Sequence, residues 1–325
     1  MPAPTFELRL EPAAIDDAAL VAGLESLRDP SEPRDPVLLR HWWKMADEHE
    51  KTLRRIDVRD GTAVAFVAAY HEPWENGLRR FGGVRPVLRY DVWSDDDFAR
   101  LVEIGEAWLR EEEAEIAVVR VREDFELELA VLARLGYHED RRMRISELDL
   151  VARREEILAR AGRLRDEMHA QHVEMVPLAE DRDPDRYRKL YELMMESEQD
   201  IPTTVPRRVP DFDEWWRFWF ENPAIRQDRF WVAREGDAIV GTSVLDSPTV
   251  QGVPWTAYTG TARKVRGRGI ARALKYQSMA QAIEVGFTRV RTTNDADNPP
   301  ILQINLEMGY QLISPILELH HNIGA

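Results

Sequence analysis

The sequence has no cysteine, fewer basic than acidic residues and no long hydrophobic run, and each of these features excludes a class of protein. Without cysteine there are no disulfides, thiolate metal sites or cysteine nucleophiles. Without a run of 18 apolar residues, and with Met-Pro-Ala-Pro-Thr at the start, we expect neither a membrane span nor a secretory signal but a cytoplasmic protein. The 44 lysines and arginines against 59 acidic residues give a formal charge of −15, which repels nucleic acid and suits a neutral or cationic partner.

The chain does contain enough apolar sequence for two domains, with 325 residues of which 44% are hydrophobic. Its eight histidines are scattered along the sequence. Neighbours such as His169 with His172, or His320 with His321, are interpreted as surface residues rather than ligands. The sequence therefore predicts no metal site.

The most informative segment joins an apolar strand that ends at Thr259-Gly260-Thr261 to a helix, through Arg266-Gly267-Arg268-Gly269-Ile270-Ala271. Glycines at such a turn let backbone N–H groups approach an anion, and the N-terminus of the helix offers more amides and a positive dipole end. The two arginines add mobile cations. The segment, called the glycine turn below, is predicted to bind a pyrophosphate group.

A regular order of elements follows the glycine turn. The helix ends at Gly286, and a strand is expected over 288–293. Asn298-Pro299 has the cap and proline typical of another helix start. That helix ends at Met308-Gly309-Tyr310, and a final strand is expected over 316–319.

This order of elements, with its Asn-x6-Asn-x3-Gly-Tyr motif, resembles the GNAT superfamily of acyl-CoA-dependent N-acyltransferases over residues 171–325. The residues that match the two family signatures are Arg266, Gly269, Ala271, Asn298, Gly309 and Tyr310. The resemblance implies an α/β (α+β) fold, in which helices flank a mixed, mostly antiparallel central sheet. It also implies acetyl-CoA as the co-substrate.

The resemblance further implies where acetyl-CoA binds. The pantetheine arm pairs with the exposed edge of the strand before the glycine turn, and the pyrophosphate rests on the turn. Splaying of this strand from the next one leaves an N–H free to hold the developing oxyanion. The expected cofactor-binding residues are Thr259, Gly260, Thr261, Arg266, Gly267, Arg268, Gly269, Ile270, Ala271, Asn298 and Asn305.

Reaction in this family is direct attack of an amine on the thioester, and a protonated amine must first lose a proton. The candidate bases are Asp246 at a strand end and Glu196, Glu198 and Asp200 after the first helix of the second half. Each of them also fits the description of a solvated surface carboxylate. Asp246 and Glu198, together with Asn305, are our catalytic candidates.

Asn305 stands where many family members have a tyrosine that protonates the leaving thiolate. An amide is not a general acid at neutral pH, although its NH2 group can hydrogen-bond the sulfur. Since a thiol has a pKa of about 8.5, its thiolate is a tolerable leaving group, and we expect activity to survive. The alternative is that Asn305 only caps or packs its helix.

Two landmarks recur at the same spacing. Trp42-Trp43 and Trp215-Trp216 are 173 residues apart, and so are Leu135-Gly136-Tyr137 and Met308-Gly309-Tyr310. A repeat of this length predicts two copies of one fold in tandem.

We therefore predict two tandem GNAT-like domains, at 1–150 and 171–325, joined by a linker helix over 151–170. At the position of the glycine turn, the first copy reads Trp93-Ser94-Asp95-Asp96-Asp97-Phe98, without glycine. Three carboxylates at a helix N-terminus stabilise the helix but repel a pyrophosphate. We interpret the first copy as degenerate, serving as a scaffold, shaping the acceptor pocket or forming a homodimer.

The predicted function is acetyl-CoA-dependent N-acetylation of a small-molecule amine, with one active site, in the second domain. Two alternatives stay open. A regulatory protein that binds acyl-CoA without turnover would have the same fold. A tandem-domain peptidyl transferase that uses aminoacyl-tRNA would share the doubled architecture, but the charge of −15 and the intact glycine turn disfavour it.

Overall fold

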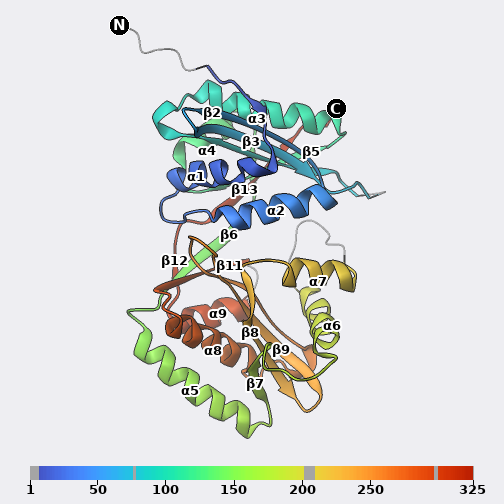
Figure 1. Cartoon of the computed structure of the whole chain (residues 1–325), viewed down its shortest axis with the longest axis vertical. Coiled ribbons are helices and arrows are strands. Elements are labelled where there is room, and N and C mark those ends of the chain that lie inside the picture. The colour runs from blue at the N-terminus through green and yellow to red at the C-terminus, as the bar shows by residue number, and fades with distance from the viewer. Residues whose placement is uncertain (1–6, 76–77, 201–208, 296–298, 325) are drawn as a thin grey trace. The chain divides into compact units, whose positions relative to one another are not determined.

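The computed structural model describes residues 7–75, 78–200, 209–295 and 299–324 (Figure 1). Internal contacts divide the chain into two units. Unit 1 consists of Met1–Met143, Thr249–Gly252 and Ser314–Ala325, and unit 2 consists of Arg144–Pro248 and Val253–Ile313.

Unit 1 is a mixed, mostly antiparallel sheet flanked by helices. Its strands lie in the order β1-β2-β3-β4-β5-β13-β6, and among the described pairs β4 and β5 run parallel. The strands are β1 (Glu11–Pro12), β2 (Lys51–Arg59), β3 (Thr62–His71), β4 (Phe81–Leu88), β5 (Ile116–Arg122), β6 (His138–Asp149) and β13 (Ile316–Asn322). The helices are η1 (Ile15–Asp17), α1 (Ala18–Arg28), α2 (Pro36–His49), η2 (Tyr90–Val92), α3 (Asp95–Glu111) and α4 (Glu126–Arg134).

The central strand β3 shows why helices cover both faces of this sheet. It is buried without interruption over residues 63–69, the pattern of a strand that is covered on both sides. Because alternate side chains point to opposite faces, Phe66 stacks on Trp43 of α2, whereas Val67 belongs to the core cluster of α3 and α4.

Unit 2 repeats this plan. Its strands lie in the order β7-β8-β9-β10-β11-β6, where residues 144–149 of β6 belong to the unit and β12 pairs with them. The strands are β7 (Glu174–Pro177), β8 (Ile225–Glu235), β9 (Ala238–Asp246), β10 (Trp255–Thr261), β11 (Arg289–Asp295) and β12 (Gln311–Leu312). The helices are α5 (Arg154–Ala170), α6 (Arg186–Glu198), α7 (Phe212–Phe220), η3 (Arg263–Val265), α8 (Ile270–Glu284) and α9 (Pro299–Met308). Both units therefore confirm the predicted fold class.

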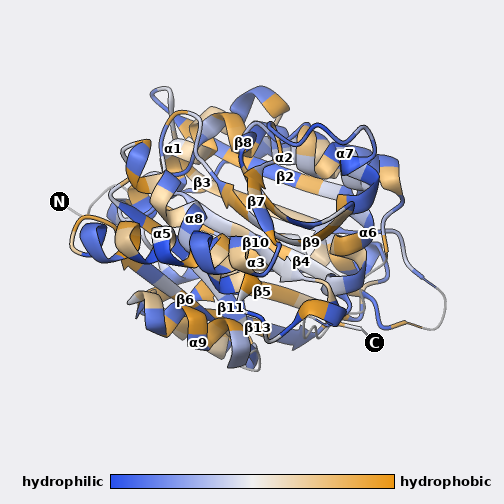
Figure 2. Ribbon diagram, turned by 90° about the horizontal axis from the view of Figure 1, so that it is seen from below, coloured by the Kyte–Doolittle hydropathy of each residue, from blue (hydrophilic) through white to orange (hydrophobic). Residues whose placement is uncertain are grey.

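Strand β9 lies at the centre of unit 2, with α8 against one face and α6 contacting the sheet as well. Its residues 239–245 are all buried. A side chain at Gly241 would come within 2.9 Å of Ile270 and 3.0 Å of Leu274, so glycine allows α8 to approach the strand closely. Figure 2 shows hydrophobic residues concentrated in central strands such as β9 and β5, whereas helices such as α5 alternate along their length.

The residues expected to form a linker helix contain α5, whose buried side chains belong to the core of unit 2. Helix α5 packs on α8 through buried side chains that include Ile157 and Leu164. Gln277 of α8 also donates a hydrogen bond to the carbonyl of Ala161 over 2.8 Å.

The last strand of the chain belongs to the sheet of unit 1. The last strand, β13, lies in unit 1 between β5 and β6, with Ile316 opposite Arg122 and Asn322 opposite Ile116. Residues 144–149 of β6 belong to unit 2.

Candidate active site

The glycine turn lies between β10 and α8 in unit 2. Gly267 and Gly269 have φ angles of 81° and 84°, in the left-handed region that favours glycine. Gly269 is the N-cap residue of α8, and no side chain caps the helix there. The first amides of α8 therefore lack the intrahelical and side-chain acceptors that would satisfy them, as an anion site requires.

The arginines of the turn are already engaged in ion pairs. Arg266 lies 2.5 Å from Asp200, which also pairs with Arg263 at 2.8 Å. Arg268 pairs with Glu235 at 2.9 Å. Arg266 and Arg268 are thus held rather than mobile, and a phosphate at the turn would compete with carboxylates for them.

The open edge of β10 lies immediately before the turn. Strand β10 stays paired with β9 to its end, with Gly260 opposite Thr242 and Thr261 opposite Gly241. Among the described residues, its pairing with β11 is limited to Trp255 opposite Arg291. A register shift between Thr256 and Tyr258 accompanies this change. The strands therefore splay as expected, and the β10 backbone that includes Thr259 is left without a described partner on the β11 side.

Gly260 allows α6 to approach this edge. A side chain there would lie 2.8 Å from Ser197 Oγ and 2.8 Å from the ring of Tyr258. The Ser197 hydroxyl donates to the carbonyl of Leu193 over 2.8 Å and lies 2.6 Å from the Tyr258 hydroxyl, which therefore donates to it. Sequence reasoning missed Ser197 and Tyr258, although a glycine inside a strand is a known sign of close approach.

The candidate bases are not gathered at one point. Glu198 ends α6 and directly follows Ser197, the residue that lies next to Gly260. Asp246 ends β9 opposite Trp255, which is five residues from Gly260, or about 16 Å along the strand.

The other two carboxylates are already engaged in hydrogen bonds. Glu196 accepts the backbone N–H of Arg263 at 2.7 Å. Hydrogen bonds from Arg263 and Arg266 hold the pKa of Asp200 far below its usual range, which makes this carboxylate a weak proton acceptor.

Asn305 is buried in α9 and forms part of a polar cluster. Its side-chain oxygen accepts a hydrogen bond from Lys275 of α8, and its amide donates to Asn294 Oδ1 of β11 over 2.6 Å. Lys275 is 0% exposed, and burial lowers its pKa to about 7. Its nitrogen also lies 4.6 Å from the ring centroid of Tyr310. Asn298, the other predicted ligand of this region, lies outside the described residues.

Lys275 was missed by the sequence analysis. A lysine on a helix is normally read as a surface residue, and α8 contains other charged residues, such as Arg272 and Glu284, that are not buried. Only the packing of α8 against the sheet, α5 and α9 reveals that Lys275 points inward.

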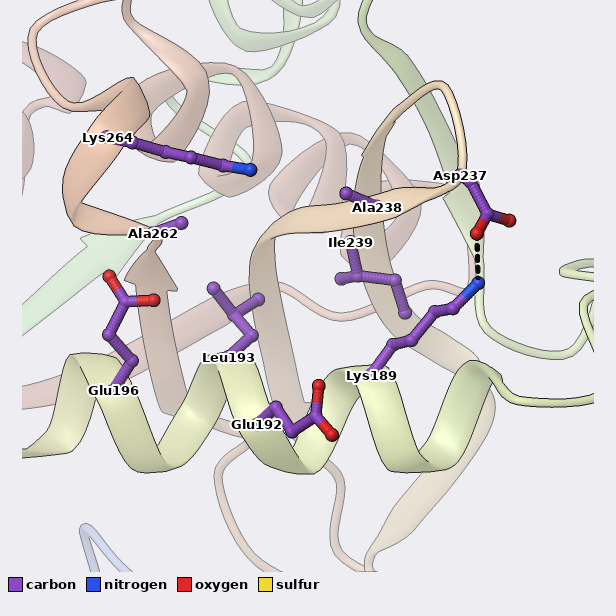
Figure 3. A pocket seen from close by; sticks show the side chains of 9 residues that line it. All are labelled: Lys189, Glu192, Leu193, Glu196, Asp237, Ala238, Ile239, Ala262 and Lys264. Carbon is purple, nitrogen blue, oxygen red and sulfur yellow. Dashed lines mark ion pairs between the residues drawn. The ribbon is translucent and has the colours of Figure 1, made fainter.

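A hollow opens beside the glycine turn, between α6, the start of β9 and η3 (Figure 3). Lys264 extends over it from the turn side, and Glu192 lines it from α6. Lys189 is bound to Asp237 at 2.8 Å. The hollow is lined by both acidic and basic side chains, so its charge does not favour an anion over a cation.

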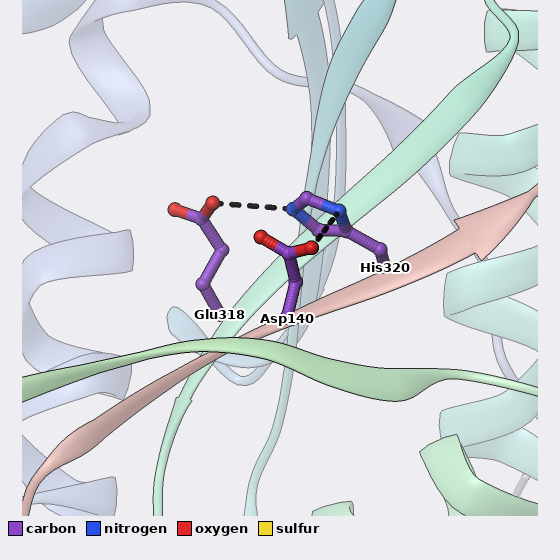
Figure 4. A group of neighbouring side chains, drawn as sticks. All are labelled: Asp140, Glu318 and His320. Atoms are coloured by element: carbon purple, nitrogen blue, oxygen red, sulfur yellow. Dashed lines mark hydrogen bonds and ion pairs between the residues drawn. The ribbon is translucent and has the colours of Figure 1, made fainter. Parts of the chain in front are cut away.

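A histidine with two carboxylates lies far from this turn in sequence, within unit 1 (Figure 4). His320 lies 3.1 Å from Glu318 and 3.6 Å from Asp140, and it is buried rather than exposed as predicted. The other oxygen of Glu318 is 2.8 Å from Arg120. The hydrogen bond with His320, together with the charge of Arg120, lowers the pKa of Glu318 to about 2. A metal ion would have to displace Arg120, so the group carries no argument for a metal site.

The corresponding helix start in unit 1, the N-terminus of α3, is capped by a side chain. Helix α3 begins at Asp95, and the hydroxyl of its N-cap Ser94 accepts the N–H of Asp97 at 3.3 Å. Asp95 accepts the indole N–H of Trp93 at 2.9 Å. Carboxylates and a cap thus occupy the place that glycines leave open in unit 2.

Comparison with known proteins agrees with this geometry. Residues 187–309 match the model of the Acetyltransferase (GNAT) family. No curated protein sequence matches the chain. Among the described residues, no helix combines the length and apolar character needed to cross a membrane.

Several solved structures share the fold across both units. A GCN5-related N-acetyltransferase from Sphaerobacter thermophilus is 18% identical, with a TM-score of 0.66 over 98% of this chain and 96% of that one. A tandem GNAT protein from the clavulanic acid biosynthesis pathway is 15% identical, with a TM-score of 0.72 over 98% and 99%. A fungal GCN5-related glucosamine N-acetyltransferase region is 13% identical, with a TM-score of 0.68 over 98% of this chain and 38% of that one.

Proposed function

We propose that this chain, in which residues 187–309 match the acetyltransferase (GNAT) family, uses unit 2 to transfer an acetyl group from acetyl-CoA to a small-molecule amine. One observation carries the proposal. An open strand edge in β10 is followed, after the short helix η3, by a glycine turn and a helix N-terminus that no side chain caps. A pantetheine arm and a pyrophosphate, joined in that order in coenzyme A, match such a strand edge and turn.

The pyrophosphate is assigned to the backbone amides of residues 266–271. Helix N-termini favour anions because their free N–H groups and dipole act together. Arg266 and Arg268 assist after exchanging Asp200 and Glu235 for phosphate oxygens. The arm then pairs with Thr259, Gly260 and Thr261.

The reaction is direct attack of the amine nitrogen on the thioester carbonyl. Holding donor and acceptor together supplies much of the rate, and an N–H of the splayed strand stabilises the oxyanion. Glu198 is the preferred base, since it adjoins Ser197, which packs against the β10 edge. Asp246 stays the second candidate.

The acceptor is proposed to be a small neutral or cationic amine rather than nucleic acid or a membrane. The formal charge of −15 favours such a molecule at long range. An amino sugar is one chemical class to include, because one similar structure is named as a glucosamine N-acetyltransferase region.

The second candidate function is a protein that binds acyl-CoA without turnover. It is favoured by Asn305, which cannot serve as the proton donor expected at its position. Calorimetric titration with acetyl-CoA and an assay of free-thiol release across a panel of amines separate the two. Binding with thiol release supports the enzyme, binding without release for any amine supports the silent binder, and absence of binding rejects both.

A further inference from the structure

Lys275 is a buried amine without a carboxylate partner among the described residues. Its side chain is 0% exposed, and it donates a hydrogen bond to the neutral oxygen of Asn305. Removing an ammonium group from water costs several kcal/mol unless an opposite charge compensates. An apolar residue would pack at this position at lower cost. We therefore expect Lys275 to have a role in which it loses and regains a proton.

The surroundings of Lys275 connect it to the open strand edge. Asn305 joins Lys275 to Asn294 of β11, the strand whose described pairing with β10 stops at Arg291. An ammonium has three N–H donors. One N–H of Lys275 is donated to Asn305, and the ring of Tyr310 lies near the nitrogen. At least one N–H therefore has no acceptor among the described residues.

We propose that Lys275 donates the proton that converts the departing coenzyme A thiolate into a free thiol. This inference rests on the proposed acetyl transfer. It assigns to a lysine on α8 the task that Asn305 cannot perform.

The amine nitrogen forms a bond to the carbonyl carbon, the carbon–sulfur bond breaks, and its electron pair goes to sulfur. A proton moves from Lys275 Nζ to sulfur and leaves a neutral amine. The acetylated nitrogen gives its surplus proton to the base, and Lys275 takes up a proton from water before the next turnover.

The acidity of Lys275 suits this transfer. An ordinary lysine, with a pKa of about 10.4, would give its proton to a thiolate of pKa about 8.5 only at a thermodynamic cost. Burial lowers the pKa of Lys275 to about 7, so transfer to the thiolate becomes favourable. About half of the lysines would be protonated at pH 7.

The test compares Lys275→Met and Lys275→Gln with wild type in the full chain. Glutamine can still donate a hydrogen bond to Asn305 but has no proton to transfer. We expect kcat to fall by on the order of 100-fold in both variants, with the dissociation constant of acetyl-CoA unchanged. The wild-type decline of kcat as pH rises through about 7 should be absent from both. Lys44→Met, an exposed lysine of unit 1, is the matched control and should keep the wild-type rate and pH profile.

A second measurement needs no activity. The unfolded chain binds a proton at lysine up to pH about 10.4, whereas folded Lys275 releases it above about 7, so the stability of wild type should rise with pH between these values. Lys275→Met lacks this group. The urea midpoint of Lys275→Met should therefore exceed that of wild type most at pH 7, and the difference should shrink steadily up to pH 10.

The outcomes separate this inference from the proposed function. Wild type that binds acetyl-CoA but releases no thiol contradicts the acetyl transfer itself. Wild type that turns over, with Lys275→Gln equally fast, contradicts proton donation alone. A urea midpoint difference that does not change with pH contradicts a neutral buried lysine. If Lys275→Met fails to fold, Lys275→Gln decides the kinetic question.

Discussion

The starts of helices α3 and α8 differ although both follow a strand and a short turn in the same fold. At α3, Ser94 caps the helix and three aspartates surround its first turn. At α8, the N-cap residue is Gly269, which has no side chain to accept a hydrogen bond, and arginines lie nearby. A side chain thus caps the start of α3, whereas none caps the start of α8. Two copies of one fold can thus differ in what satisfies the first amides of a helix, and under the proposed function only the second copy would bind acetyl-CoA, because activity depends on the site and not on the architecture.

The largest expected effect comes from making α8 resemble α3. Arg266→Glu with Gly269→Asp should weaken acetyl-CoA binding by about 100-fold or more, because it places two carboxylates where the pyrophosphate is proposed to lie. Calorimetry measures the affinity. Circular dichroism and thermal unfolding must show a folded protein, and retained affinity in that folded variant would contradict the proposed site.

An intermediate effect is expected at Asp200, which competes with phosphate for Arg266. Asp200→Asn should raise acetyl-CoA affinity by about three- to tenfold at low salt, and the gain should shrink in high salt because the pair is exposed. Because the pKa of Asp200 is lowered far below its usual range, the carboxylate stays ionised from pH 5 to 9, and the gain should not vary with pH there. Unchanged or lower affinity would show that Asp200 positions Arg266 instead of competing for it.

The smallest effect on binding is expected in unit 1. Asp96→Ala removes an exposed carboxylate from the first turn of α3 and should lower the free energy of unfolding by about 0.3–1 kcal/mol. Acetyl-CoA affinity should stay within about twofold of wild type. A large change in affinity would mean that unit 1 takes part in binding, and the contrast between the two helix starts would fail.

Local sequence was sufficient to predict the glycine turn, its backbone and the acidic start of α3. These features depend on a few adjacent residues, such as Gly267, Gly269 and Ser94, whose preferences hold in any fold. The splaying of β10 from β11 was also predicted, through the family resemblance.

Features that depend on contacts distant in sequence were not predicted. The ion pair of Arg266 with Asp200 spans 66 residues, and the bond of Lys275 to Asn305 spans 30. Burial of Lys275 follows from packing on several elements at once, which no periodicity of α8 encodes. The pairing of β13 with β5 joins residues about 200 positions apart, beyond the reach of any local pattern.

The pairing of β13 has a consequence for biosynthesis. Domains at the N-terminus of a protein commonly fold while the rest is still being translated. Here the sheet of unit 1 contains residues 316–322, so it cannot close until the ribosome has made nearly the whole of the sequence described. Until then, nascent β5 and β6 present free strand edges, and a chaperone that shields them would act on this protein late in its synthesis.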